Sequence, residues 1–506
     1  MSLPTRVRAL IAAGALTAAA AIGAAVPAAA SASTATVISF DGTPIHVNYF
    51  SAPGLKAGHR APTVLVGPGW GSAGDTNPND SQLGPLRAAG FNVVTWDPRG
   101  FGSSGGTVQI DSPQYEGRDV SAIITWVAHQ PWALLDRKND PRIGMAGGSY
   151  GGGIQLVTAA IDKRVDAIVP EIAWHSLITS LDKNDTVKTG WSGVLYLAGV
   201  AGSHGRLNPL ITEANADGQA GRPLTAQERN FFASRGPGSL ISRIHVPTLI
   251  IQGTVDTLFT LQEGVTNYGI LKRDHVPVKM IWFCGGHGIC LDNPGDAGLV
   301  TRETVAWLKR YLMHDRHVNT GPGFTWVDQK GHERSDSAYP LSAPTRALRA
   351  HGKGTLTINN TGGAGPIVAP PGSGALGAVA AGITPAKAAN AVNLRFAAPS
   401  RTRLLMWAPT LTLTYRGTAT KHSTRVFAQL VDDANGEVLG HQITPVPVTL
   451  DGKTHTITLP LEIVAAMVAR GQHITLQITP STVAYAAQRA TGTIHFSKIA
   501  ISIPAI

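Results

Sequence analysis

One short stretch constrains this chain more than any other, the glycine-rich segment around Ser149. Gly147, Ser149 and Gly151 form the pattern Gly-x-Ser-x-Gly between an apolar, strand-like run and the helix-permissive residues 154–161. A serine in a sharp turn between a strand and a helix can hold its hydroxyl clear of the sheet. This requires that neighbouring positions carry no Cβ atom to collide with the turn. The segment therefore predicts a strand, a tight turn and a helix, with Ser149 as a nucleophile.

Two further residues have the chemistry that such a serine needs. A serine hydroxyl becomes a good nucleophile when an imidazole takes its proton and a carboxylate holds that imidazole in the right tautomer. Asp256 follows the apolar run 247–252, and His287 stands between glycines after the run 278–283. The chain order Ser149, Asp256, His287 is the order described for α/β-hydrolases. The alternatives are a turn or helix-capping role for Asp256 and a structural role for His287.

Acyl transfer also needs N–H donors for the oxyanion that develops on the attacked carbonyl group. The backbone N–H of Tyr150, directly after the nucleophile, supplies one donor. The second donor is expected from the loop 69–71, which contains Trp70 and follows the apolar run 63–66. No cluster of His, Asp and Glu has metal-ligand spacing, so the sequence predicts neither a metal nor a cofactor.

Strand-like and helical patterns alternate over the first part of the chain, which predicts a mostly parallel sheet with helices on both faces. We interpret residues 33–174 and 244–318 as an α/β-hydrolase core and residues 175–243 as a lid inserted into it. Strands are expected at 35–50 (a hairpin), 63–66, 91–96, 165–172, 247–252 and 278–283, and helices at 115–129, 261–271 and 297–312.

Beyond about residue 319 the helical patterns nearly vanish. Short Thr- and Val-rich runs separated by Gly, Pro and Asn predict an all-β sandwich over residues 319–506. Residues 362–389, rich in Gly, Ala and Pro, are expected to form a long or partly disordered loop.

The first 32 residues have the composition of a secretory signal. Arg6 and Arg8 precede the uncharged, alanine-rich run 9–26, and the residues 30–32 (Ala-Ser-Ala) offer a cleavage site. We therefore expect a secreted protein that begins near Ser33 and is not held in a membrane after cleavage. An uncleaved membrane anchor is the alternative.

Charge and cysteine content narrow the possibilities further. The net charge is +10, but the basic residues are scattered without a run of five or more, which argues against nucleic-acid binding. Cys284 and Cys290 are the only cysteines and flank His287. In an exported chain such a pair is expected to form a disulfide, the alternative being two buried thiols.

Four segments carry a family resemblance: 97–105 (DPRGFGSSG), 116–119, 126–132 and 147–150. They resemble the Xaa-Pro dipeptidyl-peptidase family (peptidase S15) and the CocE/NonD hydrolases, which include cocaine-esterase-like enzymes. The resemblance extends over almost all of the chain after the signal segment. It implies the triad Ser149, Asp256 and His287, the helical lid, and a C-terminal jelly roll of the galactose-binding-like type.

The chain departs from this family pattern in two places. Such enzymes often carry a tyrosine hydroxyl in the oxyanion hole where this chain has Trp70, so the second donor would be the main chain or the indole N–H of Trp70. The large N-terminal helical domain of the lactic-acid-bacterial dipeptidyl-peptidases has no counterpart in the sequence.

These observations together predict a secreted serine hydrolase that cleaves amide or ester bonds through an acyl-enzyme. Its partner would be a peptide or a small ester, and nothing in the sequence fixes the oligomeric state. We favour Xaa-Pro dipeptidyl-peptidase-like action, with a CocE-like carboxylesterase as the alternative. A dipeptidyl-peptidase must pair the free ammonium of its substrate, and Glu171 is the candidate, with the aromatic Trp174 as part of the substrate pocket; the alternative for Glu171 is a surface or capping carboxylate. A third hypothesis is a non-catalytic protein that binds glycan or a surface polymer, which the intact triad residues argue against.

Overall fold

A computed structural model describes residues 33–369, 374, 379 and 383–506, so the predicted signal segment 1–32 lies outside the described residues. The predicted loop 362–389 is described only in part. Within the described ranges, no helix is both long and apolar enough to cross a bilayer.

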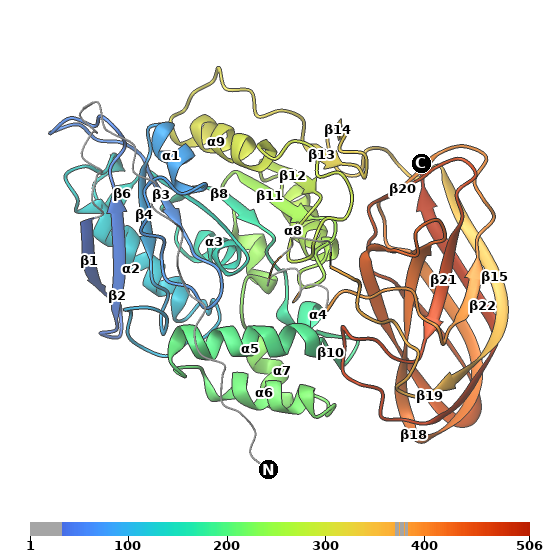
Figure 1. Ribbon diagram of the computed structural model, residues 1–506. Coiled ribbons are helices and arrows are strands. Elements are labelled where there is room, and N and C mark those ends of the chain that lie inside the picture. Colours follow the sequence, from blue (N-terminus) through green and yellow to red (C-terminus); the bar gives the residue numbers. More distant parts are fainter. Residues whose placement is uncertain (1–32, 370–373, 375–378, 380–382) are drawn as a thin grey trace, which may run out of the picture. The chain divides into compact units, whose positions relative to one another are not determined.

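The first part of the chain folds around a sheet of ten strands in the order β1-β2-β4-β3-β7-β8-β11-β12-β13-β14 (Figure 1). The seven strands from β4 to β13 in this order are parallel, and the pairings β1–β2, β2–β4 and β13–β14 are antiparallel. The strands are β1 Ser33–Ile38, β2 Pro44–Phe50, β3 Thr63–Val66, β4 Asn92–Trp96, β7 Ile143–Gly148, β8 Val165–Glu171, β11 Thr248–Gly253, β12 Val278–Phe283, β13 Phe324–Val327 and β14 Glu333–Asp336. A two-stranded ribbon, β5 Leu135–Arg137 and β6 Asp140–Pro141, lies outside this sheet.

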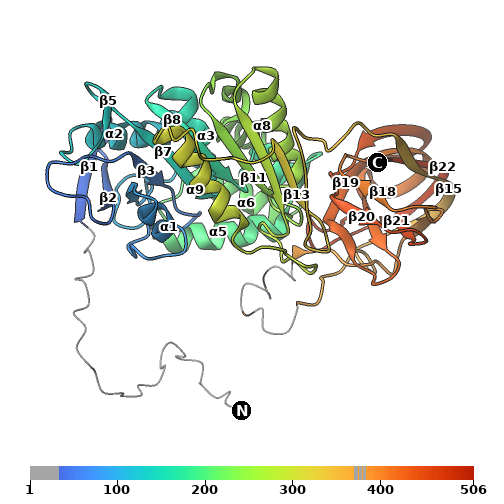
Figure 2. The same ribbon diagram turned by 90° about the horizontal axis from the view of Figure 1, so that it is seen from above.

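Helices cover both faces of the sheet, as Figure 2 shows from above. One apolar cluster joins the sheet to α2 (Glu116–Ala128), α3 (Tyr150–Ile161) and α8 (Leu261–Arg273). A second cluster joins the opposite face to α1 (Leu83–Ala88) and α9 (Leu299–Leu312). Burial of both faces explains why the parallel strands are continuously apolar in sequence. The predicted α/β-hydrolase fold class is confirmed.

The insertion between β8 and β11 is largely helical. It contains α4 Leu177–Leu181, β9 Asp182–Lys183, β10 Thr186–Val187, α5 Thr189–Ser203, α6 Pro209–Gln219, α7 Ala226–Ala233 and the 3₁₀ turn η1 Gly238–Arg243. Capping residues in the sequence mark where two of its helices begin. Asn208 caps α6 ahead of a first-turn proline, and Thr225 and Glu228 form a reciprocal capping box on α7.

The C-terminal region consists of a six-stranded antiparallel sheet wrapped nearly into a barrel and a separate two-stranded sheet of β17 (Arg403–Leu405) and β20 (Ala466–Val468). The long strand β18 (Thr410–Asp432) pairs with β22 (Gly492–Ala505) along its first half and with β21 (Ile474–Thr479) along its second half. It also pairs with β19 (Val438–Pro460), and register shifts along β18 allow the sheet to fold over its own core. The remaining strands are β15 Arg346–Ile358 and β16 Val392–Arg395.

The boundary predicted at residue 319 needs correction, because β13 and β14 lie beyond it and still belong to the first sheet. β13 pairs in parallel with β12, and all four of its residues are buried. A four-residue apolar strand has the same sequence pattern in either region, so only the pairing distinguishes the two.

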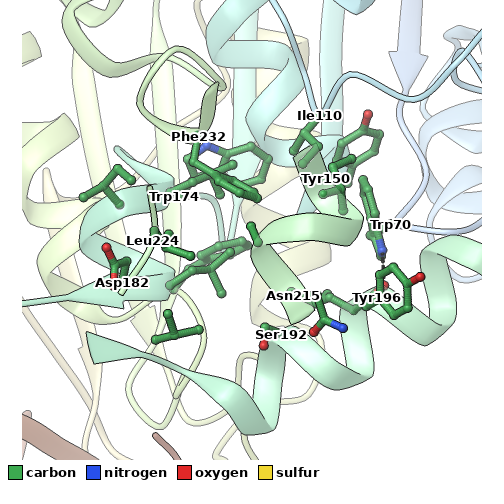
Figure 3. Close-up of a pocket in the computed structure, with 18 of the residues that line it drawn as sticks. Trp70, Ile110, Tyr150, Trp174, Asp182, Ser192, Tyr196, Asn215, Leu224 and Phe232 are labelled. Atoms are coloured by element: carbon green, nitrogen blue, oxygen red, sulfur yellow. Dashed lines mark hydrogen bonds between the residues drawn. The ribbon is translucent and has the colours of Figure 1, made fainter. Parts of the chain in front are cut away.

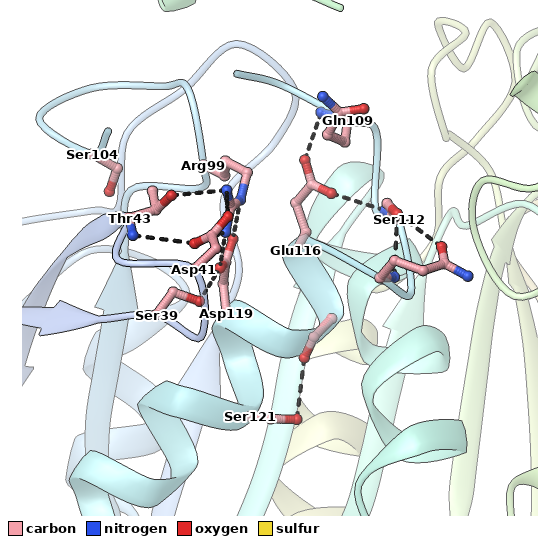
Figure 4. A network of polar contacts seen from close by, with 12 residues as sticks. Ser39, Asp41, Thr43, Arg99, Ser104, Gln109, Ser112, Glu116, Asp119 and Ser121 are labelled. Atoms are coloured by element: carbon pink, nitrogen blue, oxygen red, sulfur yellow. Dashed lines mark hydrogen bonds and ion pairs between the residues drawn. The ribbon is translucent and has the colours of Figure 1, made fainter. Parts of the chain in front are cut away.

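A buried arginine fixes the start of the sheet to α2 (Figure 4). The guanidinium of Arg99 donates to Asp41 of the β1–β2 turn and to Asp119 of α2. On the same helix Glu116 accepts backbone N–H groups of Gln109 at 2.6 Å and Ser112 at 3.0 Å. These contacts explain why residues 97–105 and 116–119 form one motif: they are the two sides of one polar cluster.

Candidate active site

The segment around Ser149 adopts the predicted turn between β7 and α3. Ser149 lies at φ +56° and ψ −117°, a backbone conformation that residues other than glycine rarely adopt. A Cβ atom at Gly147 or Gly151 would lie 2.6 Å or 2.1 Å from the carbonyl oxygen of Gly67. The two glycines therefore permit the close approach of β3 that the strained turn requires.

The three predicted triad residues meet at the carboxyl ends of β7, β11 and β12. The hydroxyl of Ser149 lies 2.8 Å from Nε2 of His287, and Nδ1 of His287 lies 2.7 Å from Oδ2 of Asp256. Phe259 and Trp191 present their rings edge-on to the imidazole, with centroids at 5.1 and 5.7 Å. This geometry allows a proton to pass from the serine to an imidazole whose tautomer the carboxylate fixes.

The other carboxylate oxygen of Asp256 also accepts hydrogen bonds. Oδ1 accepts the backbone N–H groups of Leu258 at 2.9 Å and Phe259 at 2.8 Å. The Asp256 side chain is fully buried, so these donors replace the water that the charged group loses. The carboxylate is thus held in one orientation before any substrate binds.

The backbone N–H of Tyr150 stands at the first position of α3, where no intrahelical acceptor exists. This is the position of the predicted first oxyanion donor. The indole alternative for Trp70 does not hold, because its Nε1–H donates to the carbonyl of Leu195 at 2.7 Å. Only the main-chain N–H of Trp70 is left as the second candidate donor.

Asp97 is a residue that sequence reasoning left without a role. Its carboxylate accepts the backbone N–H groups of Gly74 and Ser103, each at 2.8 Å. It therefore fastens the loop that carries Trp70 to the loop 97–105. Its place at the head of the DPRG motif, directly after a buried strand, was the signal that could have identified it.

An apolar cavity opens beside Ser149 (Figure 3). Its walls come from the lid helices α4 to α7, from Tyr150 at the start of α3 and from the loops that carry Trp70 and Phe259. Trp174, predicted as part of the substrate pocket, is one of its lining residues. Asp182 is the one charged side chain among those that line it, and Arg229 pairs with its carboxylate. Burial raises the pKa of Asp182 to about 6, although the charge of Arg229 opposes this effect.

Glu171, the predicted ammonium partner, does not line this apolar cavity. It lines a separate cavity together with Gly67, Asp75 and residues of α1 and α9. Side chains alternate along β8, so Val169 and Glu171 point toward the α1/α9 face, away from Trp174. Burial raises the pKa of Glu171 to about 7, and the nearby His287 opposes the shift. Proximity to Trp174 in sequence therefore misplaced this carboxylate.

Cys284 and Cys290 are joined in a disulfide, with a Cα–Cα distance of 5.4 Å. The loop that they close contains His287. The imidazole of His287 thus lies on a short cross-linked segment after β12.

A buried carboxyl group lies against α3, the helix that follows Ser149. Asp111 is fully buried, and neither of its carboxylate oxygens has a hydrogen-bond partner. Burial, together with the nearby carboxylate of Glu116, raises the pKa of Asp111 well above its ordinary value. The folded protein therefore keeps this group protonated at pH values where the unfolded chain has released the proton.

The Asp111→Asn variant should accordingly gain stability over the wild type as the pH rises. A group with a raised folded-state pKa contributes stability below its unfolded pKa and loses it as the pH climbs toward the folded value. The difference in free energy of unfolding should grow by up to about 1.4 kcal/mol per pH unit above about pH 4. Urea unfolding of both proteins between pH 4.5 and 8 measures it. Parallel curves would show that Asp111 ionises normally in the fold.

Comparison with known proteins bears out the family resemblance over about half of the chain. Residues 41–288 match the family model described as X-Pro dipeptidyl-peptidase (S15 family). The chain spans only about a third of the length of the curated relatives it matches, 35% and 28% in two of them.

Solved structures extend the likeness in fold over nearly the whole chain. An α-amino acid ester hydrolase has a TM-score of 0.73 at 13% identity, over 96% of this chain and 98% of its own. An aminopeptidase from the marine sediment archaeon Thaumarchaeota archaeon has a TM-score of 0.72 at 13% identity, over 96% and 99%. A CocE/NonD family hydrolase of Staphylococcus aureus has a TM-score of 0.66 at 14% identity, over 94% and 93%. The predicted resemblance to the X-Pro dipeptidyl-peptidase (S15) family is confirmed over residues 41–288, and the likeness in fold extends over nearly the whole chain.

Proposed function

We propose that this protein is a secreted carboxylesterase that hydrolyses esters with an apolar acyl group through an acyl-enzyme on Ser149. The observation that carries the proposal is the relay from Ser149 through His287 to Asp256, which opens onto a cavity with almost purely apolar walls. Secretion rests on the signal-like segment 1–32 and agrees with the disulfide beside His287.

The chemistry follows from the relay. His287 takes the proton of the Ser149 hydroxyl as its oxygen bonds to the ester carbonyl carbon, and the N–H of Tyr150 stabilises the resulting oxyanion. The imidazolium then returns the proton to the departing alkoxide, so the alcohol leaves and an acyl-serine is left. Water, deprotonated by His287, attacks the acyl-serine, and release of the acid restores the hydroxyl.

The lining of the cavity favours an uncharged acyl group. A free ammonium inside it would lose its water and would find Asp182, whose carboxylate Arg229 already neutralises. Glu171, the other carboxylate near the triad, faces the second cavity. We therefore place ester hydrolysis ahead of the dipeptidyl-peptidase activity that the sequence favoured.

Dipeptidyl-peptidase action stays the second candidate because two observations favour it. The matching family model is that of an X-Pro dipeptidyl-peptidase, and one solved structure of similar fold is an aminopeptidase. If this candidate holds, Asp182 is the carboxylate within the cavity that could pair with the substrate ammonium.

Paired substrates separate the two candidates. We expect kcat/KM for p-nitrophenyl butyrate to exceed that for Ala-Pro-p-nitroanilide by about 100-fold or more, because the ammonium loses hydration without gaining a free partner. A fluorophosphonate probe should label the wild type and leave Ser149→Ala unlabelled. Faster cleavage of Ala-Pro-p-nitroanilide, abolished by N-acetylation and weakened in KM by Asp182→Asn, would establish the peptidase instead. Absence of labelling would favour the non-catalytic binding protein.

A further inference from the structure

The loop that carries the catalytic acid, residues 254–260, is held from outside the sheet by two other parts of the chain. From the lid, Trp191 donates its indole N–H to Oγ1 of Thr257 at 3.0 Å. From the β region, Gln442 donates to the carbonyl of Asp256 at 2.8 Å, and Glu462 accepts the Thr260 hydroxyl at 2.8 Å. We call this segment the acid loop.

A buried lysine of the lid makes the most informative contact with the acid loop. Nζ of Lys188 lies 2.9 Å from the carbonyl oxygen of Thr257 and 3.1 Å from that of Leu258. Only 3% of Lys188 is exposed, so the ammonium has exchanged its water for these carbonyl groups.

The two carbonyl groups belong to the same peptide units that hold the catalytic carboxylate. The unit between Thr257 and Leu258 offers its C=O to Lys188 and its N–H to Oδ1 of Asp256. The next unit does the same through the carbonyl of Leu258 and the N–H of Phe259. A cation at the carbonyl end of a peptide group polarises it and strengthens the hydrogen bond that its N–H donates.

We propose that Lys188 is a positioning residue of the triad, which fixes and stabilises the Asp256 carboxylate through two intervening peptide units. The proposal rests on the proposed function, in which Asp256 orients His287. It gives the lid a second task besides forming the acyl pocket, because folding of the lid delivers the cation that completes the site.

The charge of Lys188 is set by its surroundings. Glu462, Lys183, Asp256 and Glu263 act on its ammonium, and the ring of Tyr485 lies 5.9 Å from it. Burial lowers the pKa of Lys188 to about 8, while the nearby carboxylates oppose the shift. The wild-type kcat should therefore decline as the pH rises through this value and the ammonium is lost.

Substitution of Lys188 tests the proposal. Lys188→Met should lower kcat for p-nitrophenyl butyrate by about 10- to 100-fold with KM nearly unchanged, as expected for the loss of a charge-assisted hydrogen bond to a buried group. Lys188→Arg keeps a cation and should recover most of the activity and move the alkaline decline upward. The matched control is Lys183→Met. This neighbour pairs with Glu462 at 2.9 Å and makes no hydrogen bond to the acid loop. The kcat of the folded variant should therefore stay within about threefold, although loss of one partner of a buried ion pair is expected to lower its stability.

A double-mutant cycle with Asp256→Asn separates positioning from general stability. If Lys188 acts through Asp256, Lys188→Met should have less than about a threefold effect in the Asp256→Asn background. Equal effects in both backgrounds would overturn the proposal, whereas a fully active Asp256→Asn enzyme would refute the triad itself. Should Lys188→Met fail to fold, the same double-mutant cycle can be measured with Lys188→Gln and Lys188→Arg. A kcat for Lys188→Gln equal to that of Lys188→Arg would then overturn the role of the charge.

Discussion

Ser149→Ala and His287→Ala are each expected to lower kcat by on the order of 10⁶-fold, with the double variant no slower than either single one. Both residues contribute to one event, the transfer of a proton from the hydroxyl while its oxygen attacks the substrate. The 2.8 Å contact between them has no function once either partner is gone. Their losses therefore should not add.

The measurement is steady-state hydrolysis of p-nitrophenyl butyrate, with circular dichroism to confirm that each variant is folded. Ser112→Ala is a suitable control, because this buried serine bonds to Gln114 and Glu116 rather than to the triad. Its rate should stay near that of the wild type. Additive losses in the Ser149 and His287 double variant would mean that the two residues act in separate steps.

The parts of the site that the sequence predicted are those with local signals. Ser149 was identifiable because the close packing of β3 on the turn demands glycine at positions 147 and 151, which leaves a readable spacing. Asp256 and His287 follow buried strands, and the carboxyl ends of neighbouring parallel strands share one edge of the sheet. The alternation of strand and helix patterns is also a local signal, and it predicted the α/β core.

The parts that escaped prediction depend on contacts between distant segments. Lys188 meets the acid loop across 69 residues, Gln442 across 186 and Glu462 across 202. Nothing in the sequence around these side chains distinguishes them from surface residues. The indole alternative for the second oxyanion donor failed for the same reason, since the carbonyl group that the indole N–H of Trp70 meets belongs to Leu195, 125 residues further along.

The direction of a side chain at a strand end was also beyond sequence reasoning. Glu171 and Trp174 are three positions apart, yet the end of β8 and the residue Ile172, at φ +41°, separate them onto different cavities. A backbone reversal of this kind depends on the surrounding packing. Because Glu171 lines the second cavity and not the apolar one, the favoured substrate is an apolar ester and not an amine-bearing peptide.

Asp256→Asn is expected to lower kcat by about 10⁴-fold while leaving the fold intact, a magnitude taken from a serine protease in which the same change was made. The structure gives the reason. Oδ1 of Asp256 accepts two backbone N–H groups, so an asparagine must place its carbonyl oxygen there and turn its NH₂ toward Nδ1 of His287. The imidazole must then accept at Nδ1 and carry its proton on Nε2.

A proton on Nε2 faces the Ser149 hydroxyl and cannot take up another, so the relay is blocked although every atom stays in place. The expected signature is a large fall in kcat, with KM and the urea midpoint close to those of the wild type. Asp292→Asn provides the control, because this half-buried aspartate follows the disulfide loop and does not contact the triad. If Asp256→Asn kept a rate within about tenfold of the wild type, another carboxylate would have to orient His287. Glu171, whose charge already acts on that imidazole, would be the first to test.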